Sequence, residues 1–152
     1  MGKVIGIAAR EKAKDPMVVY ASARVSMSKG VADESRGLPK NDRQVTVMTI
    51  ESWREVCAEI GRNLHWTTRR ANILIEGVNL ENTKGDLLKI GDFMLEITGE
   101  LKPCGRMDQY HLGLTKALSP NWRGGVTCKI LKEGFVCEGD QVALGEKVAI
   151  SK

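Results

Sequence analysis

The sequence predicts a mainly β fold, a closed or partly closed barrel with one or two short helices. The first observation is that about eight short segments alternate apolar and polar residues, the spacing of a strand with one buried face. The second is that glycine-containing turns such as Gly91-Asp92 and Glu133-Gly134 separate several of them. Many short strands joined by such turns are typical of barrels and sandwiches.

Two strands at the start of the chain are predicted to pair as an antiparallel hairpin. Residues 3–9 and 17–27 both alternate, and in the second stretch the odd positions from Met17 to Met27 form the apolar face. The polar segment 11–16 connects them.

A long polar loop and another strand come next. Residues 30–43 are rich in charged residues and contain two glycines. Loops of this length in a compact domain are usually functional or disordered. Residues 44–50 then form the strand.

An amphipathic helix is predicted after that strand. Apolar residues follow the i, i+3, i+4, i+7 spacing from Trp53 onward, and Gly61 ends the segment. Ser52-x-x-Glu55 fits a capping box, although Thr49 could equally be the N-cap.

The rest of the chain supplies the remaining strands and a second, weaker helix. The strands are expected at residues 71–75, 87–90, 93–101, 125–131, 135–137 and 141–150. The helix is expected over residues 108–118, where Gly113 interrupts it and Pro120 ends it. No repeat, low-complexity tract or linker divides the chain, so we expect residues 1–152 to form one domain.

Composition restricts the class of protein. Hydrophobic residues make up 42% and charged residues 28%, as in globular proteins. No apolar run is long enough for a membrane span or a signal peptide, so we expect a cytoplasmic protein. The net charge of +4 favours anionic ligands only mildly. Three Trp, two Tyr and two Phe are too few for a base-stacking platform, which argues against nucleic acid.

Three of the four cysteines are predicted to lie in the core. Cys57 lies on the apolar stripe of the helix, and Cys128 and Cys137 lie on apolar faces of strands, where a free thiol behaves as a small hydrophobe. The chain has no Cys-x-x-Cys pair, and neither histidine is at zinc-ligand spacing from a cysteine. We therefore expect no structural zinc.

Cys104 is the cysteine placed for chemistry. It falls off the apolar face of strand 93–101, and Pro103 ends that strand. Lys102 and Arg106 flank it, and nearby cations favour a thiolate. A thiolate can attack an electrophile, ligate a soft metal or hold a persulfide sulfur. These residues alone leave an idle surface cysteine as an equal alternative.

Four stretches of the chain match a known family in their order and spacing. They are residues 30–47 (GVADESRGLPKNDRQVTV), 68–79 (TRRANILIEGVN), 87–104, and 122–140 (WRGGVTCKILKEGFVCEGD). Together they resemble the MOSC domain, the C-terminal domain of molybdenum-cofactor sulfurases, and especially its small stand-alone bacterial members. The resemblance implies a β-rich barrel and a key cysteine that carries sulfur or ligates molybdenum. That cysteine corresponds to Cys104.

The resemblance also implies a site for the pterin-based molybdenum cofactor, molybdopterin. Arginine forks bind phosphate, amides can read a pterin edge, and glycine lets a loop approach closely. The candidate binding residues are Arg36, Gly37, Arg43, Gln44, Arg70, Asn72, Arg106 and Arg123. A solvated surface role is the alternative for Arg36 and Arg123, and capping of backbone groups is the alternative for Gln44 and Asn72. Many family members carry a histidine in the loop at residues 33–37, and this chain has none there.

Two functions follow as alternatives. In the first, Cys104 accepts sulfur as a persulfide from a cysteine desulfurase, which is a separate pyridoxal-phosphate protein, and passes it to a metal–sulfur or molybdoenzyme acceptor. In the second, the protein is a non-catalytic cofactor-binding module in which Cys104 ligates molybdenum. A barrel that binds nucleic acid or protein through a basic surface ranks third. The sequence leaves open whether the domain turns over any substrate as a sulfur transferase.

Overall fold

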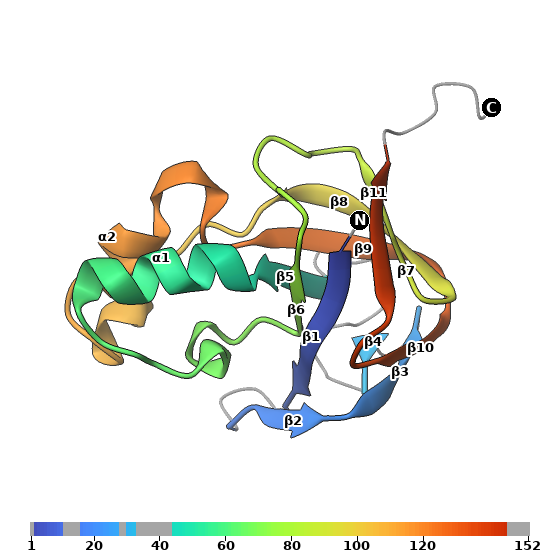
Figure 1. Ribbon diagram of the computed structural model, residues 1–152, viewed down its shortest axis with the longest axis horizontal. Helices are drawn as coiled ribbons and strands as arrows, with labels where there is room; N and C mark the ends of the chain where they lie inside the picture. Colours follow the sequence, from blue (N-terminus) through green and yellow to red (C-terminus); the bar gives the residue numbers. More distant parts are fainter. Residues whose placement is uncertain (1, 11–15, 28–29, 33–43, 146–152) are drawn as a thin grey trace.

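Seven strands of the computed structural model close into a mixed barrel in the order β11-β7-β8-β9-β5-β6-β1, with β11 pairing back to β1 (Figure 1). The structure describes residues 2–10, 16–27, 30–32 and 44–145. The barrel strands are β1 (Gly2–Ala9), β5 (Val45–Thr49), β6 (Ile73–Glu76), β7 (Leu87–Ile90), β8 (Phe93–Glu100), β9 (Val126–Lys132) and β11 (Gln141–Gly145). Only the β5–β6 pair within the barrel is parallel. The predicted closed barrel is confirmed.

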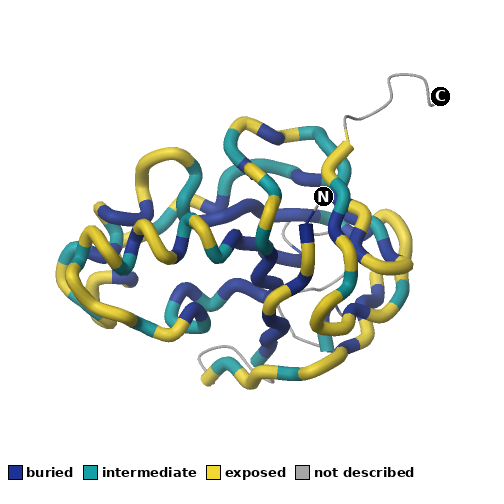
Figure 2. The backbone as a smooth tube through the Cα atoms, in the orientation of Figure 1, coloured by how far each residue is buried: buried dark blue, intermediate teal, exposed yellow. Residues whose placement is uncertain are grey.

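Alternate residues of several strands are buried and fill the barrel, and Figure 2 shows them as dark blue segments that alternate with teal or yellow ones along the backbone. Phe93, Leu95 and Ile97 of β8 are fully buried, whereas Met94 and Glu96 between them are half-buried. This confirms the faces predicted for residues 93–101. Removing these apolar side chains from water is the main favourable contribution to folding.

The predicted strand at residues 17–27 is wrong as a single strand. It is divided into β2 (Val18–Tyr20), which pairs with β1 as predicted, and β3 (Ser22–Ser26). β3 lies in a second sheet with β4 (Gly30–Val31) and β10 (Gly134–Cys137). Because the chain changes sheets, one face does not stay inside, and Val19 and Met27 are 49% and 42% exposed.

The first helix, α1 (Ile50–Ile60), is confirmed, and Thr49 rather than Ser52 is its N-cap. The Thr49 side chain accepts a hydrogen bond from the Ser52 backbone N–H at 3.1 Å. Gly61 ends the helix in a left-handed conformation (φ 69°), which glycine adopts without a steric penalty.

The second predicted helix is broken into shorter pieces. A 3-10 helix, η3 (Gly105–Gln109), precedes the short α2 (Leu114–Leu118), and a further 3-10 turn, η4 (Pro120–Trp122), follows it. Gly113 separates η3 from α2 because its φ of 90° is incompatible with a continuous right-handed helix. α1 and α2 pack together at one end of the barrel, around a second apolar cluster that includes Trp53 and Leu118 (Figure 1).

Candidate functional site

The four cysteines have different environments. Cys128 is fully buried, as predicted, and burial raises the pKa of its thiol. Cys57 is half-buried at the edge of the helical cluster. The prediction that Cys137 lies in the core is wrong, since it is exposed. The reason is that Val136 is the residue of β10 that faces inward, so Phe135 and Cys137 face outward.

Cys104 is exposed and lies in the loop that leaves β8. It occupies the N-cap position of η3 with extended backbone angles, and its thiol makes no capping hydrogen bond. Its carbonyl oxygen accepts two hydrogen bonds, from the Met107 backbone N–H at 3.0 Å and from the Thr115 hydroxyl at 2.9 Å. The backbone of the cysteine is therefore anchored, while its sulfur faces solvent.

Asp108, in η3, stabilises the same turn through a second hydrogen bond with Thr115. Its carboxylate accepts a hydrogen bond from the Thr115 backbone N–H at 2.9 Å. The hydrogen bonds from Thr115, first that of its backbone and then that of its side chain, hold the pKa of Asp108 below its ordinary value of 3.8. Thr115 thus links the Asp108 carboxylate to the Cys104 carbonyl group.

The link predicts a local response to acid. Because the folded-state pKa of Asp108 is lowered, its bond to Thr115 is fully present above the unfolded-state pKa. The bond is lost as the pH falls through the folded-state pKa. We expect the Thr115 amide resonance to titrate by NMR with a midpoint below 3.8 and to stop titrating in Asp108→Asn. A midpoint at or above that value would contradict the bond.

Arg69 is a site residue that the sequence reasoning missed. It is the last residue of the 3-10 helix η2 (Trp66–Arg69) and is only 6% exposed. Its Nη2 donates to the Leu101 carbonyl oxygen at 2.7 Å, its Nε to the Gly124 carbonyl oxygen at 3.1 Å, and its Nη1 to the Met107 sulfur at 3.8 Å. The basic pair Arg69-Arg70 was the available signal, but it does not tell which arginine faces inward.

Two of the predicted binding residues have buried amides that bond to backbone groups. Asn72 is fully buried; its Oδ1 accepts from the Thr46 N–H and its Nδ2 donates to the Ala8 carbonyl oxygen, both at 3.1 Å. Gln44 accepts from the Ile130 N–H at 3.0 Å and donates to the Met27 carbonyl oxygen at 2.7 Å. These contacts correspond to the backbone-capping alternative that the sequence left open.

The described candidate arginines lie in or at the ends of three different 3-10 helices. Arg123 pairs with Glu59 at 2.9 Å and Glu55 at 3.4 Å, which ties it to α1. Arg70 is half-buried in a left-handed conformation at the end of η2, and Arg106 is exposed on η3. The remaining candidates, Arg36, Gly37 and Arg43, lie outside the described residues, as does most of the predicted loop.

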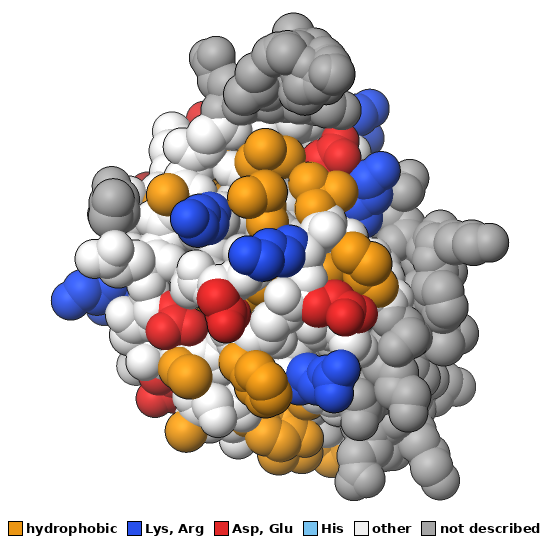
Figure 3. Space-filling model, turned by 90° about the vertical axis from the view of Figure 1, so that its right-hand side faces the viewer, with side chains coloured by type: hydrophobic (Ala, Val, Ile, Leu, Met, Phe, Trp, Pro, Cys, Tyr) orange, Lys and Arg blue, Asp and Glu red, His pale blue; other side chains and the backbone are white. Residues whose placement is uncertain are grey.

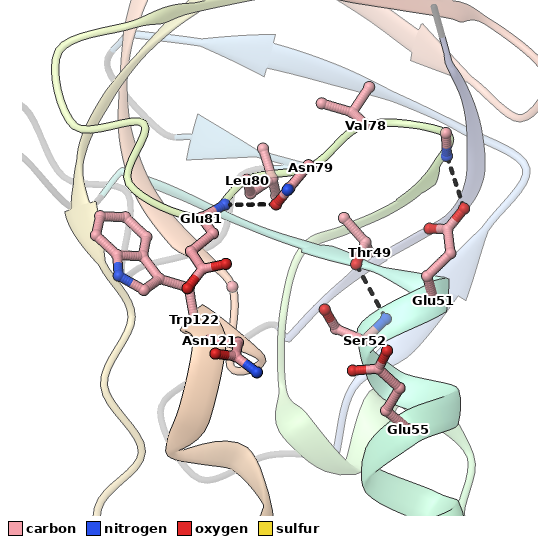
Figure 4. Close-up of a pocket in the computed structure, with 12 residues that line it drawn as sticks. Thr49, Glu51, Ser52, Glu55, Val78, Asn79, Leu80, Glu81, Asn121 and Trp122 are labelled. Atoms are coloured by element: carbon pink, nitrogen blue, oxygen red, sulfur yellow. Dashed lines mark hydrogen bonds between the residues drawn. The ribbon is translucent and has the colours of Figure 1, made fainter.

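Two cavities open near α1, and neither is lined by Cys104. The first, of about 400 Å³, lies at the start of α1, with Glu51 and Glu55 on one side and Glu81 beside Trp122 on the other (Figure 4). Its acidic wall is unsuited to a phosphate group. The second, of about 720 Å³, is an apolar groove between α1 and the chain that follows it, beside Cys57.

The barrel end that faces away from the helices has a mixed surface. Figure 3 shows hydrophobic side chains interspersed with charges of both signs, and the described residues form no continuous basic patch on this face. Such a face does not favour binding to a phosphate backbone. No helix in the described ranges is long and apolar enough to cross a membrane.

The fold and the position of the exposed cysteine together define the class of protein. A closed mixed barrel of short strands carries helices at one end, and its cysteine loop follows β8. The chain belongs to the MOSC family: the family model for the MOSC domain matches residues 34–143. The resemblance inferred from the sequence is confirmed.

Solved structures have the same fold at low sequence identity. YuaD from Bacillus subtilis is 17% identical with a TM-score of 0.78, and the match covers 96% of this chain and 97% of that chain. YiiM from Geobacillus stearothermophilus is 16% identical with a TM-score of 0.77, covering 96% and 76%. YiiM from Escherichia coli is 12% identical with a TM-score of 0.71, covering 96% and 71%. No curated protein sequence matches this chain.

Proposed function

We propose that this MOSC protein carries sulfur as a persulfide on Cys104. The observation that carries the proposal is the exposed thiol on an anchored backbone, between the exposed cations Lys102 and Arg106. Cys137 is also exposed, but Glu138 and Asp140 follow it, and the Asp140 carboxylate bonds its backbone N–H at 2.8 Å. Cys104 has a cation on each side of it in the sequence, whereas acidic residues follow Cys137, so Cys104 is the cysteine that we propose as the sulfur carrier.

The transfer requires no external oxidant. The Cys104 thiol first gives its proton to solvent. Its thiolate then attacks the terminal sulfur of a donor cysteine persulfide, the donor S–S bond breaks, and the donor leaves as a thiolate. Cys104 then holds the sulfur as its own persulfide, with the oxidation state of the transferred sulfur unchanged. A cysteine desulfurase is the class of partner that supplies such a persulfide.

The surface beside Cys104 is suited to a protein donor. Tyr110 and Leu112 follow η3 and are 42% and 82% exposed, so two large apolar side chains lie next to the cysteine loop in the sequence. Exposed apolar groups with cations at their edge are typical of contact surfaces for other proteins. A metal–sulfur or molybdenum protein would then receive the sulfur.

The described residues offer weaker support for a molybdopterin site. Asn72 and Gln44 are buried with amides bonded to the backbone, and Arg123 is paired with two glutamates. These observations favour the persulfide carrier over the cofactor-binding module.

Mass spectrometry of the intact protein tests the carrier function. After incubation with a cysteine desulfurase and cysteine, we expect wild type to gain about 32 Da, one sulfur atom, which a reductant removes. Cys137→Ser should gain the same mass, and Cys104→Ser should gain none. Wild type without added mass, or sulfur located on Cys137, would overturn the proposal.

Metal analysis tests the alternative module. The carrier proposal predicts that protein purified from a host that makes molybdopterin contains no stoichiometric molybdenum. Stoichiometric molybdenum in wild type that is lost in Cys104→Ser would instead favour a binding module with Cys104 as the metal ligand.

A further inference from the structure

The buried side chain of Arg69 holds the chain on both sides of Cys104. Its Nη2 donates to the Leu101 carbonyl oxygen, three residues before the cysteine, at 2.7 Å. Its Nη1 contacts the sulfur of Met107, three residues after it, at 3.8 Å. A third contact, to the Gly124 carbonyl oxygen at 3.1 Å, connects this turn to the chain entering β9.

An arginine is suited to this position. Its planar guanidinium offers several N–H donors in fixed directions, so a single side chain can bond carbonyl groups of two separate segments. Hydrogen bonds from a charged donor are also stronger than neutral ones, particularly when they are shielded from water. The contacts therefore hold a buried charged side chain against the segments before and after Cys104.

The surroundings leave little space around these contacts. A Cβ atom added at Gly124 would lie 2.7 Å from the Leu101 carbonyl oxygen and 3.0 Å from Arg69 Nη2. Both distances are shorter than normal carbon contacts. A side chain at residue 124 would therefore displace the Leu101 carbonyl group or the Arg69 side chain from its present position. Glycine at this position therefore leaves room for the contacts of Arg69 with Leu101, Gly124 and Met107, which we call the clamp.

We propose that Arg69 is a positioning residue for Cys104: its side chain contacts the chain on both sides of the cysteine and so fixes the cysteine loop. Arg69 is also followed directly by Arg70, a candidate for binding an anion. The catalytic importance of this arrangement rests on the proposed sulfur-carrier function, but its effect on the thiol does not.

Alkylation of the two exposed cysteines tests the proposal in the full chain. Cys104 and Cys137 are labelled with iodoacetamide over a range of pH, and the rate at each is measured by peptide mass spectrometry. In Arg69→Met we expect Cys104 labelling at neutral pH to slow about three- to tenfold, because the loop no longer holds the thiol in its exposed position. The labelling rate of Cys137 should stay unchanged.

Two further variants separate charge from geometry. Arg69→Lys keeps the charge but not the forked donors, so we expect the Cys104 rate to lie between those of wild type and Arg69→Met. Gly124→Ala keeps the arginine and forces the clamp open, so it should also slow Cys104, and it serves in place of Arg69→Met if that variant does not fold. Arg62→Met removes an exposed arginine that makes no ion pair in the described ranges, and it is the matched control.

The proposal is overturned if folded Arg69→Met, or Gly124→Ala in its place, labels Cys104 at the wild-type rate. Parallel changes at Cys104 and Cys137 would also overturn it, because they would indicate general loosening of the fold. The labelling requires no sulfur donor. A wild type that fails to form a persulfide therefore refutes the carrier function without deciding the role of Arg69.

Discussion

Replacing Gly125 by alanine is expected to destabilise the barrel by about 2–5 kcal/mol. Gly125 precedes β9 with a φ of 96°, a conformation that residues with a side chain rarely adopt. An added Cβ would also lie 2.3 Å from the Val47 carbonyl oxygen of β5. Relief of this overlap requires β5 and β9 to separate where Val47 pairs with Val126. Urea denaturation measures this loss in the free energy of unfolding.

Gly139→Ala is the matched control for this prediction. Gly139 has a φ of 90° in the turn before β11, but an added Cβ would meet no atom within 4 Å. Only the conformational cost remains, about 1–2 kcal/mol. Equal losses in the two variants would show that the contact with Val47 is not what requires glycine at residue 125. Because the Gly125 carbonyl oxygen accepts from the Leu101 N–H at 2.8 Å, Gly125→Ala should also disturb the cysteine loop.

Asn72→Ala is expected to lower the free energy of unfolding by about 2–5 kcal/mol, since each buried backbone group left without a partner costs about 1–3 kcal/mol. The two groups are the Thr46 N–H of β5 and the Ala8 carbonyl oxygen of β1, which the Asn72 amide bonds at 3.1 Å each. Persulfide loading of the folded variant should stay at the wild-type level. Chemical denaturation measures the free energy of unfolding, and the mass of the intact protein measures persulfide loading.

An exposed asparagine provides the control for that effect. The Asn79 side chain accepts from the Glu81 N–H at 3.0 Å in an exposed turn, where water can replace it. Asn79→Ala should cost only about 0.5–1 kcal/mol. An Asn72→Ala variant as stable as Asn79→Ala, but with altered binding of an anion, would assign Asn72 to ligand binding instead of to the backbone.

The barrel could be predicted from the sequence because its strands alternate cleanly where one face is buried, as in Phe93, Leu95 and Ile97. The same reasoning was wrong for residues 17–27, where the chain passes from one sheet to another. Alternation reports which side chains share a face, but it does not report where a strand changes its partner. Cys137 was misplaced for a related reason, since parity alone does not say which face of β10 is inside.

The candidate site was only partly predictable. The local order Lys-Pro-Cys-Gly-Arg placed Cys104 outside the strand ladder, and the structure has it exposed. Arg123 is a binding candidate because of its residue type and its place in a stretch that resembles the family, yet glutamates of α1, more than sixty positions away in sequence, bond to it. Such long-range partners have no local signal, because they depend on how the helices pack against the barrel.

The sequence by itself determined the class of fold, the family and the cysteine that leaves the strand ladder, since these depend on periodicity, turn residues and the order of short motifs. Only the tertiary structure decided which arginine is buried and what it holds. Arg69 and Arg70 are adjacent and chemically identical, and the left-handed turn at Arg70 changes the direction of the chain between their side chains. Arg69 reaches Leu101 and Gly124 because β8 and β9 bring these distant segments together beneath Cys104.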